Sequence, residues 1–121
     1  MMSVCKMFTF KSATELDEFE ISGSSYEPIG ELFHSGSKAK GTDYSALEEI
    51  ATISVMCNDS AIDFNEFKNA FEKVGEATEA ALVVLAEKIN PYGVDKRGGR
   101  LESAKVVRKV RITKAATLGS R

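Results

Sequence analysis

The chain has 121 residues, of which 43% are hydrophobic and 28% are charged, and its formal net charge is −2. This length suits one domain or part of one, and the composition is ordinary for a water-soluble protein. No stretch approaches the ~20 apolar residues of a membrane-spanning helix, and the mixed first residues, with Lys6 among them, do not resemble a signal peptide, so we expect no membrane insertion.

The charges are divided unevenly along the chain. Residues 1–94 contain 7 Lys and no Arg against 16 Asp and Glu, whereas residues 95–121 contain 4 Lys and 5 Arg against 2 acidic residues. Clustered basic residues can bind nucleic acid or an anionic membrane surface. Because no aromatic residue follows Tyr92 to stack on bases, we favour a solvated helix face in the basic tail and expect no nucleic-acid partner.

The two cysteines, Cys5 and Cys57, are separated from each other and from the single histidine, His34. This spacing favours neither a zinc site nor a disulfide framework, so we expect buried free thiols, as in a reducing cytosol, and no metal site. A thiol nucleophile at Cys57 with His34 as its base lacks a third, orienting residue, so we predict no catalytic residue in the chain.

Two strands that form a hairpin are predicted at the start of the chain. Residues 2–10 are rich in β-branched and aromatic side chains without a helical period, and we expect Val4, Phe8 and Phe10 to share one face. Residues 16–22 alternate between apolar and polar side chains, which is typical of a strand with one buried and one wet face. The predictions that follow are a turn (residues 23–25), a short extended piece (28–32) and a surface loop (34–42).

An amphipathic helix is predicted from Ser45 to Cys57. Ser45 and Glu48 fit a capping box, in which the serine side chain accepts a hydrogen bond from a first-turn amide and the glutamate reaches back. The apolar stripe of this helix is predicted from residues at helical spacing, Ala46, Ile50, Ile53 and Cys57, with Leu47 and Ala51 flanking it.

Residues 61–72 are ambiguous, because their apolar side chains fit strand alternation in part and helical spacing in part. The acidic stretch 59–66 lacks the ligand spacing of an EF-hand loop, which needs a glycine at the sixth position and a glutamate at the twelfth. We therefore expect no calcium site in it.

The chain is organised around a polar loop, residues 75–79, that leads into the apolar run 80–86. We predict a buried helix over residues 78–90, because it is apolar on most sides and is followed by a proline and a glycine. A glycine-rich basic loop over residues 95–100 and a helix over residues 101–114 with a cationic polar face are expected after it.

Several separated segments carry a family resemblance: Met2–Phe8, Ile21–Pro28, Cys57–Ser60, Glu72–Leu82 and Glu87–Asn90. In this order they resemble the nucleotide-binding domain of P-type calcium pumps, and most closely that of the sarco/endoplasmic reticulum calcium ATPases. The resemblance covers residues 2–114 and implies an α+β fold, an antiparallel sheet flanked by helices that forms the first half of that domain. Residues 115–121 do not resemble the family.

The resemblance implies a parent protein that transfers a phosphoryl group from ATP, with Mg²⁺, to the aspartate of an Asp-Lys-Thr-Gly-Thr motif and transports Ca²⁺ into the reticulum lumen. Neither that motif nor the family's later Lys-Gly-Ala motif occurs in this sequence. We therefore expect a fragment that is not catalytic alone, with ATP and the remaining pump domains as its partners, at the cytosolic face of the reticulum membrane. The alternative is a non-catalytic protein-interaction or regulatory module in the cytosol.

Glu79 is the first candidate for nucleotide binding. A carboxylate at a helix start can accept a hydrogen bond from the exocyclic amino group of adenine, and the resemblance implies this contact; the alternative is that Glu79 only complements the helix dipole. Thr78 and Glu76 are further candidates, and both could instead hold the turn. We expect no phosphate site at Gly75, because one glycine is not a phosphate loop and the neighbouring carboxylates would repel phosphates.

Overall fold

The computed structural model describes residues 2–96 and 105–119, which form an α+β fold. The first four strands make an antiparallel sheet in the order β1-β2-β3-β4, and β5 and β6 make a separate antiparallel hairpin. The elements are β1 (Lys6–Phe10), β2 (Leu16–Ile21), β3 (Leu32–His34), β4 (Ser37–Ala39), η1 (Gly41–Asp43), α1 (Ser45–Met56), β5 (Ala61–Asn65), β6 (Ala70–Val74), α2 (Ala77–Ile89) and α3 (Lys105–Gly119). The predicted fold class is confirmed.

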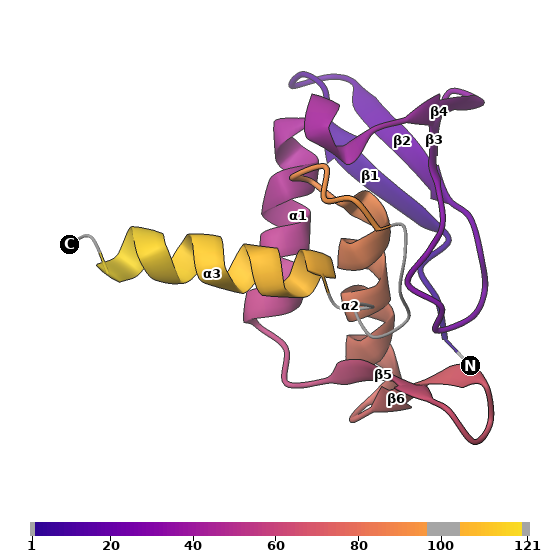
Figure 1. Ribbon diagram of the computed structural model, residues 1–121. Helices are drawn as coiled ribbons and strands as arrows, with labels where there is room; N and C mark the ends of the chain where they lie inside the picture. Colours follow the sequence, from indigo (N-terminus) through magenta and orange to yellow (C-terminus); the bar gives the residue numbers. More distant parts are fainter. Residues whose placement is uncertain (1, 97–104, 120–121) are drawn as a thin grey trace.

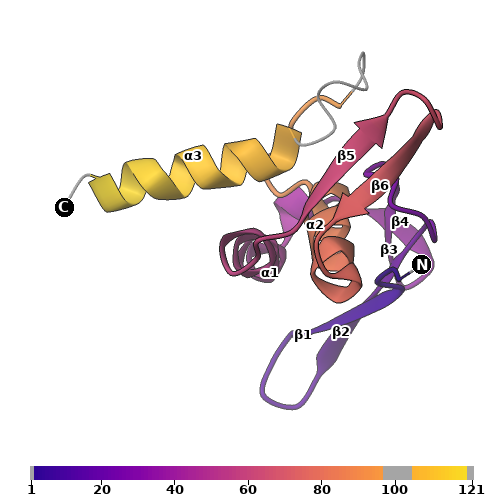
Figure 2. The same cartoon turned by 90° about the horizontal axis from the view of Figure 1, so that it is seen from below.

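The helix α2 lies at the centre of the molecule. Figure 1 shows α1 beside α2, the four-stranded sheet next to this pair, and α3 crossing α1 with its C-terminal part extending away from the rest. Seen from below in Figure 2, the β5–β6 hairpin lies beside α2. The hydrophobic core draws on residues from the four-stranded sheet, β5 and all three α-helices.

The predicted hairpin of β1 and β2 is confirmed, and Phe8 and Phe10 share one face of β1 as predicted, but that face is not the buried one. Met7 lies opposite Phe19 in the register, and both side chains are buried. Phe8 and Phe10 point to the other face and are 56% and 80% exposed, while Val4 is half-buried. The pairing register between β1 and β2 places Met7 opposite Phe19 and so determines which face of β1 covers the core. This register cannot be read from the sequence of β1 alone.

The predicted surface loop over residues 34–42 is largely a hairpin, with β3 and β4 joined by Ser35 and Gly36. Both turn residues have positive φ, 53° and 81°, which is the conformation of a tight two-residue hairpin turn. Of the extended piece predicted before it, only Leu32 belongs to a strand. The ambiguous stretch after α1 is also a hairpin, in which Phe64 of β5 lies opposite Phe71 of β6.

The helix predicted from Ser45 is confirmed as α1, but its capping box is wrong, and its buried face lies on the flanking residues Leu47 and Ala51 rather than on the centre of the predicted stripe. The N-cap residue is Tyr44, and no side chain caps the first turn. The buried line consists of Leu47, Ala51 and Val55, whereas Ile53 is 62% exposed. Cys57 and Cys5 are free thiols, as predicted, but both are exposed rather than buried.

The buried central helix is confirmed as α2, with 9 of its 13 residues buried. It ends at Asn90, which adopts the left-handed conformation with φ 47°. Helix α3 begins, in the described part, at Lys105 and reaches Gly119, so the stretch after residue 114 is helical up to that point. The predicted basic loop beyond residue 96 and the predicted helix start at residue 101 lie outside the described residues. None of the described helices is long and apolar enough to cross a membrane.

Candidate functional site

At the start of α2, the connection from β6 to α2 passes close to the connection from α1 to β5. Strand β6 ends at Val74, Gly75 has φ 104°, and the extended Glu76 is the N-cap of α2. A β-carbon at position 75 would lie 2.4 Å from the hydroxyl oxygen of Ser60. Only glycine has both the required φ and the required absence of a side chain, so the two connections can pass this closely.

The α1–β5 connection is held to the first turn of α2 by side-chain hydrogen bonds. Asn58 Nδ2 donates to the backbone carbonyl of Glu79 at 2.6 Å, and the Ser60 amide donates to Asn58 Oδ1 at 2.7 Å. The Ser60 hydroxyl donates to Glu79 Oε2 at 3.2 Å. We call Asn58, Ser60, Gly75 and Glu79 the α2-entrance cluster. Ser60 is its buried member, with 3% of its surface exposed.

The structure separates the three predicted nucleotide-binding residues. Glu79 is half-buried in the first turn of α2 and belongs to the α2-entrance cluster. Thr78 is exposed, and its hydroxyl donates to the sulfur of Met2 at 3.2 Å. Glu76 is also exposed, and its backbone carbonyl accepts the hydrogen bond of the Ala80 amide. Asn58 and Ser60 were missed as site residues, because their sequence signal shows only a turn.

The α2-entrance cluster can accept a hydrogen bond from a ligand. Glu79 Oε2 is used by Ser60, and no described residue donates to Glu79 Oε1. A carboxylate is an acceptor of up to about four hydrogen bonds and has no donor. An amino group fits such an acceptor, whereas a phosphate group does not, because Glu76 and Glu79 are both negative.

Sequence reasoning also missed a buried ion pair near the C-terminal end of α2. Glu87 of α2 is 1% exposed, and its carboxylate accepts a hydrogen bond from Lys96 Nζ at 2.7 Å. The backbone amides of Val106 and Val107 donate to the same carboxylate at 3.4 and 2.8 Å. Burial raises the pKa of Glu87, although Lys96 and the two amides lower it in part. Glu87 thus caps the described start of α3 from a neighbouring helix.

Lys88, the next residue of α2, is a buried lysine that is bound to a backbone carbonyl. It is 7% exposed, and its ammonium group donates to the backbone carbonyl of Ser22 at 2.8 Å. Burial lowers the pKa of Lys88, partly opposed by Cys5 and Glu27. Lys88 ties α2 to the turn after β2 and has no hydrogen bond to the α2-entrance cluster in the described structure.

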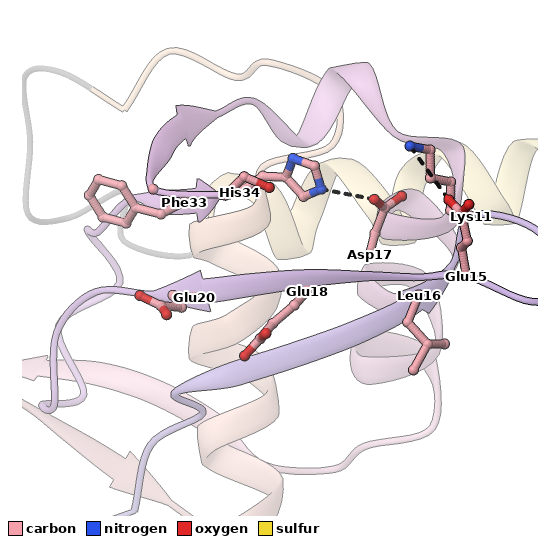
Figure 3. A pocket seen from close by; sticks show the side chains of 10 residues that line it. Lys11, Glu15, Leu16, Asp17, Glu18, Glu20, Phe33 and His34 are labelled. Carbon is pink, nitrogen blue, oxygen red and sulfur yellow. Dashed lines mark hydrogen bonds and ion pairs between the residues drawn. The ribbon is translucent and has the colours of Figure 1, made fainter.

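A pocket of about 390 Å³ lies elsewhere, on β2, the β1–β2 turn and the β3–β4 hairpin. Figure 3 shows His34 and Asp17 pointing toward each other, and Lys11 beside Glu15. His34 Nε2 and Asp17 Oδ1 are 2.8 Å apart. The ring of His34 also contacts the rings of Phe19 and Tyr44. The hydrogen-bond partner of His34 is thus Asp17 and not Cys57. This pocket shares no residue with the α2-entrance cluster.

Within residues 2–96 and 105–119, no group of three or more His, Cys, Asp or Glu side chains is arranged to hold a metal ion. The fold is that of an α+β domain, and its candidate site is the acidic start of α2. The family model described as "P-type ATPase, cytoplasmic domain N" matches residues 46–115, which is more than half of the chain. The chain belongs to this family, and the match includes the whole α2-entrance cluster.

Proposed function

We propose that this chain supplies the adenine-binding part of the ATP site of a P-type ATPase, with Glu79 as the acceptor for the exocyclic amino group. The observation that carries the proposal is the hydrogen bonding of the two Glu79 carboxylate oxygens. One of its oxygens is fixed by the buried Ser60, and the other has no donor in the described structure. The family match supports a nucleotide as the ligand, because it identifies a cytoplasmic domain of an ATPase.

Thr78 and Glu76 flank Glu79 and are both exposed, so we propose that they form the rim of the adenine site. The negative charges of Glu76 and Glu79 would orient the phosphates and their Mg²⁺ away from the start of α2. The sequence contains no Asp-Lys-Thr-Gly-Thr motif. We therefore propose that phosphoryl transfer takes place in other parts of the ATPase and that these parts are the partners of this chain.

The finer assignment is a calcium pump of the sarco/endoplasmic reticulum type. It is supported by the resemblance of Cys57–Ser60, Glu72–Leu82 and Glu87–Asn90 to that group. In this assignment the parent transports Ca²⁺ into the reticulum lumen, and the chain lies on the cytosolic face of the reticulum membrane. We propose that the transported ion binds in another part of the parent.

The adenine site is tested by NMR titration of the ¹⁵N-labelled chain with ADP. We expect saturable shifts of the amide signals of residues 75–82, while those of residues 15–18, which line the separate pocket, remain in place. Shifts confined to residues 15–18 and 33–36 would mean that the nucleotide binds in that pocket instead. A titration without saturable shifts would refute nucleotide binding by the chain.

The transported ion requires the parent protein. Antibodies against the exposed tip of the β5–β6 hairpin, residues 66–69, allow the parent to be purified from membranes. We expect ATP hydrolysis by this material to depend on Ca²⁺ and the antigen to fractionate with reticulum membranes. Hydrolysis stimulated by another cation and not by Ca²⁺ would refute the calcium assignment and leave the adenine site untouched.

A further inference from the structure

We propose that Ser60 is a positioning residue that orients the Glu79 carboxylate and thereby sets a preference for adenine over bases with a carbonyl group at the same position. The proposal rests on the proposed adenine site and adds the residue that determines its selectivity. Ser60 lies 19 positions before Glu79 in the sequence and on a different connection, and its hydroxyl reaches Oε2 of that carboxylate at 3.2 Å.

The position of the Ser60 hydroxyl is determined by three neighbours. The Ser60 amide is bound by Asn58 Oδ1, and the other end of the Asn58 amide group is bound to the Glu79 backbone. Gly75 passes so close to Ser60 that any side chain there would collide with the hydroxyl. With 3% of its surface exposed, Ser60 contacts the carboxylate from the interior side of the α2-entrance cluster.

This arrangement determines what Glu79 offers to a base. Because the buried hydroxyl donates to Oε2, the carboxylate is held in one rotamer and Oε1 stays available to a ligand. A carboxylate accepts a hydrogen bond from the 6-amino group of adenine but repels the 6-carbonyl oxygen of hypoxanthine or guanine. Without the Ser60 hydroxyl, the carboxylate can rotate toward water, and the amino group loses its preorganised acceptor.

The proposal is tested by the ratio of the affinities of the full chain for ADP and for inosine diphosphate, measured by NMR titration. We expect the wild-type chain to prefer ADP, and Ser60→Ala to reduce this preference about threefold to tenfold through weaker ADP binding alone, the range that corresponds to the net contribution of one ordinary hydrogen bond. Glu79→Gln should reduce the preference as well. Ser54→Ala is the matched control, since Ser54 is also buried, at 6% exposure, but lies on α1 without a bond to Glu79.

The outcomes separate the two proposals. A wild-type chain that binds both nucleotides equally would refute the adenine site itself. A wild-type preference that is lost in Glu79→Gln but fully retained in Ser60→Ala would refute only the positioning role. Ser60→Cys provides a second test, because a thiol keeps the shape but is a weak donor. It should show a reduced preference in a chain with dispersed amide signals, and an unchanged preference in Ser60→Cys would also overturn the positioning role.

Discussion

Glu87 and Lys96 form an ion pair of 2.7 Å, in which the carboxylate side chain is 1% exposed and the lysine side chain 18% exposed. The pair joins α2 to the segment that leads toward α3. The ammonium group of Lys96 also donates to the backbone carbonyl of Glu87 at 3.3 Å and to that of Pro28 at an unusually short distance of 2.5 Å. One lysine thereby ties α2 to the connection between β2 and β3.

Replacing Glu87 by alanine should be among the most destabilising changes in the chain. It leaves Lys96 and two backbone amides of α3 without their carboxylate, and removal of one partner of a buried pair costs about 3–5 kcal/mol. Urea unfolding of Glu87→Ala against the wild type measures this loss. Glu15→Ala is the control, because its pair with Lys11 is 3.9 Å long and mostly exposed, and such pairs contribute at most about 1 kcal/mol. Equal losses in the two variants would contradict the structural role of Glu87.

The raised pKa of Glu87 leads us to predict that the free energy of unfolding depends on pH. Burial raises the pKa of Glu87 above its ordinary value of 4.5, so the native state keeps this proton at pH values at which the unfolded chain has lost it. The resulting contribution to the free energy of unfolding is complete below the ordinary pKa and is lost as the pH rises through the raised pKa. The difference in that free energy between wild type and Glu87→Gln should therefore fall from about pH 4.5 upward and then level off. A difference that rises over this interval would mean that Lys96 and the amides outweigh burial.

The two faces of α1 give a further prediction. Leu47 is fully buried, whereas Ile53 is 62% exposed. Leu47→Ala should lower the free energy of unfolding by about 2–5 kcal/mol, since it leaves a cavity in the core. Ile53→Ala should change it by less than about 0.5 kcal/mol, as is usual for surface substitutions. Thermal or urea unfolding of the two variants distinguishes the faces, and a larger loss in Ile53→Ala would place the stripe predicted from the sequence in the core after all.

Helix α2 could be predicted because the sequence features at its start, along its length and at its end all indicate the same helix. An apolar run of small and branched residues is bounded by a polar loop and by the Asn90-Pro91 pair, so length, burial and end point all follow from local chemistry. The alternation of β2 was equally informative, since its polar side chains mark the wet face. In both elements the neighbouring residues alone determine which side is buried.

The face of α1 could not be predicted in this way, because apolar residues occur on more than one side of the helix. Ile53 and Leu47 are both acceptable core residues, and only the packing of α2 and α3 against α1 selects Leu47. The same holds for β1, where the pairing of Met7 with Phe19 decides the inner face. The β3–β4 hairpin was missed because its strands are only three residues long and lack an apolar pattern.

The candidate site was predictable in part. The helix start at Glu79 follows from the sequence, but the contribution of Ser60 depends on the close crossing at Gly75, which no local pattern records. Glu87 was missed because it follows the apolar run 80–86 and no local pattern indicates its partners. Its partners are a lysine nine residues later and amides nineteen and twenty residues later, and tertiary structure alone brings them together.

The most direct test of the account is the affinity of the chain for ADP with and without the Glu79 carboxylate. Glu79→Gln keeps the shape of the side chain and removes its charge, so we expect ADP binding to weaken about tenfold, the effect of losing a charged acceptor. Glu66→Gln, at the exposed turn between β5 and β6, removes an equal charge and should leave the affinity unchanged. Equal affinities of wild type, Glu79→Gln and Glu66→Gln would contradict the claim that Glu79 binds adenine.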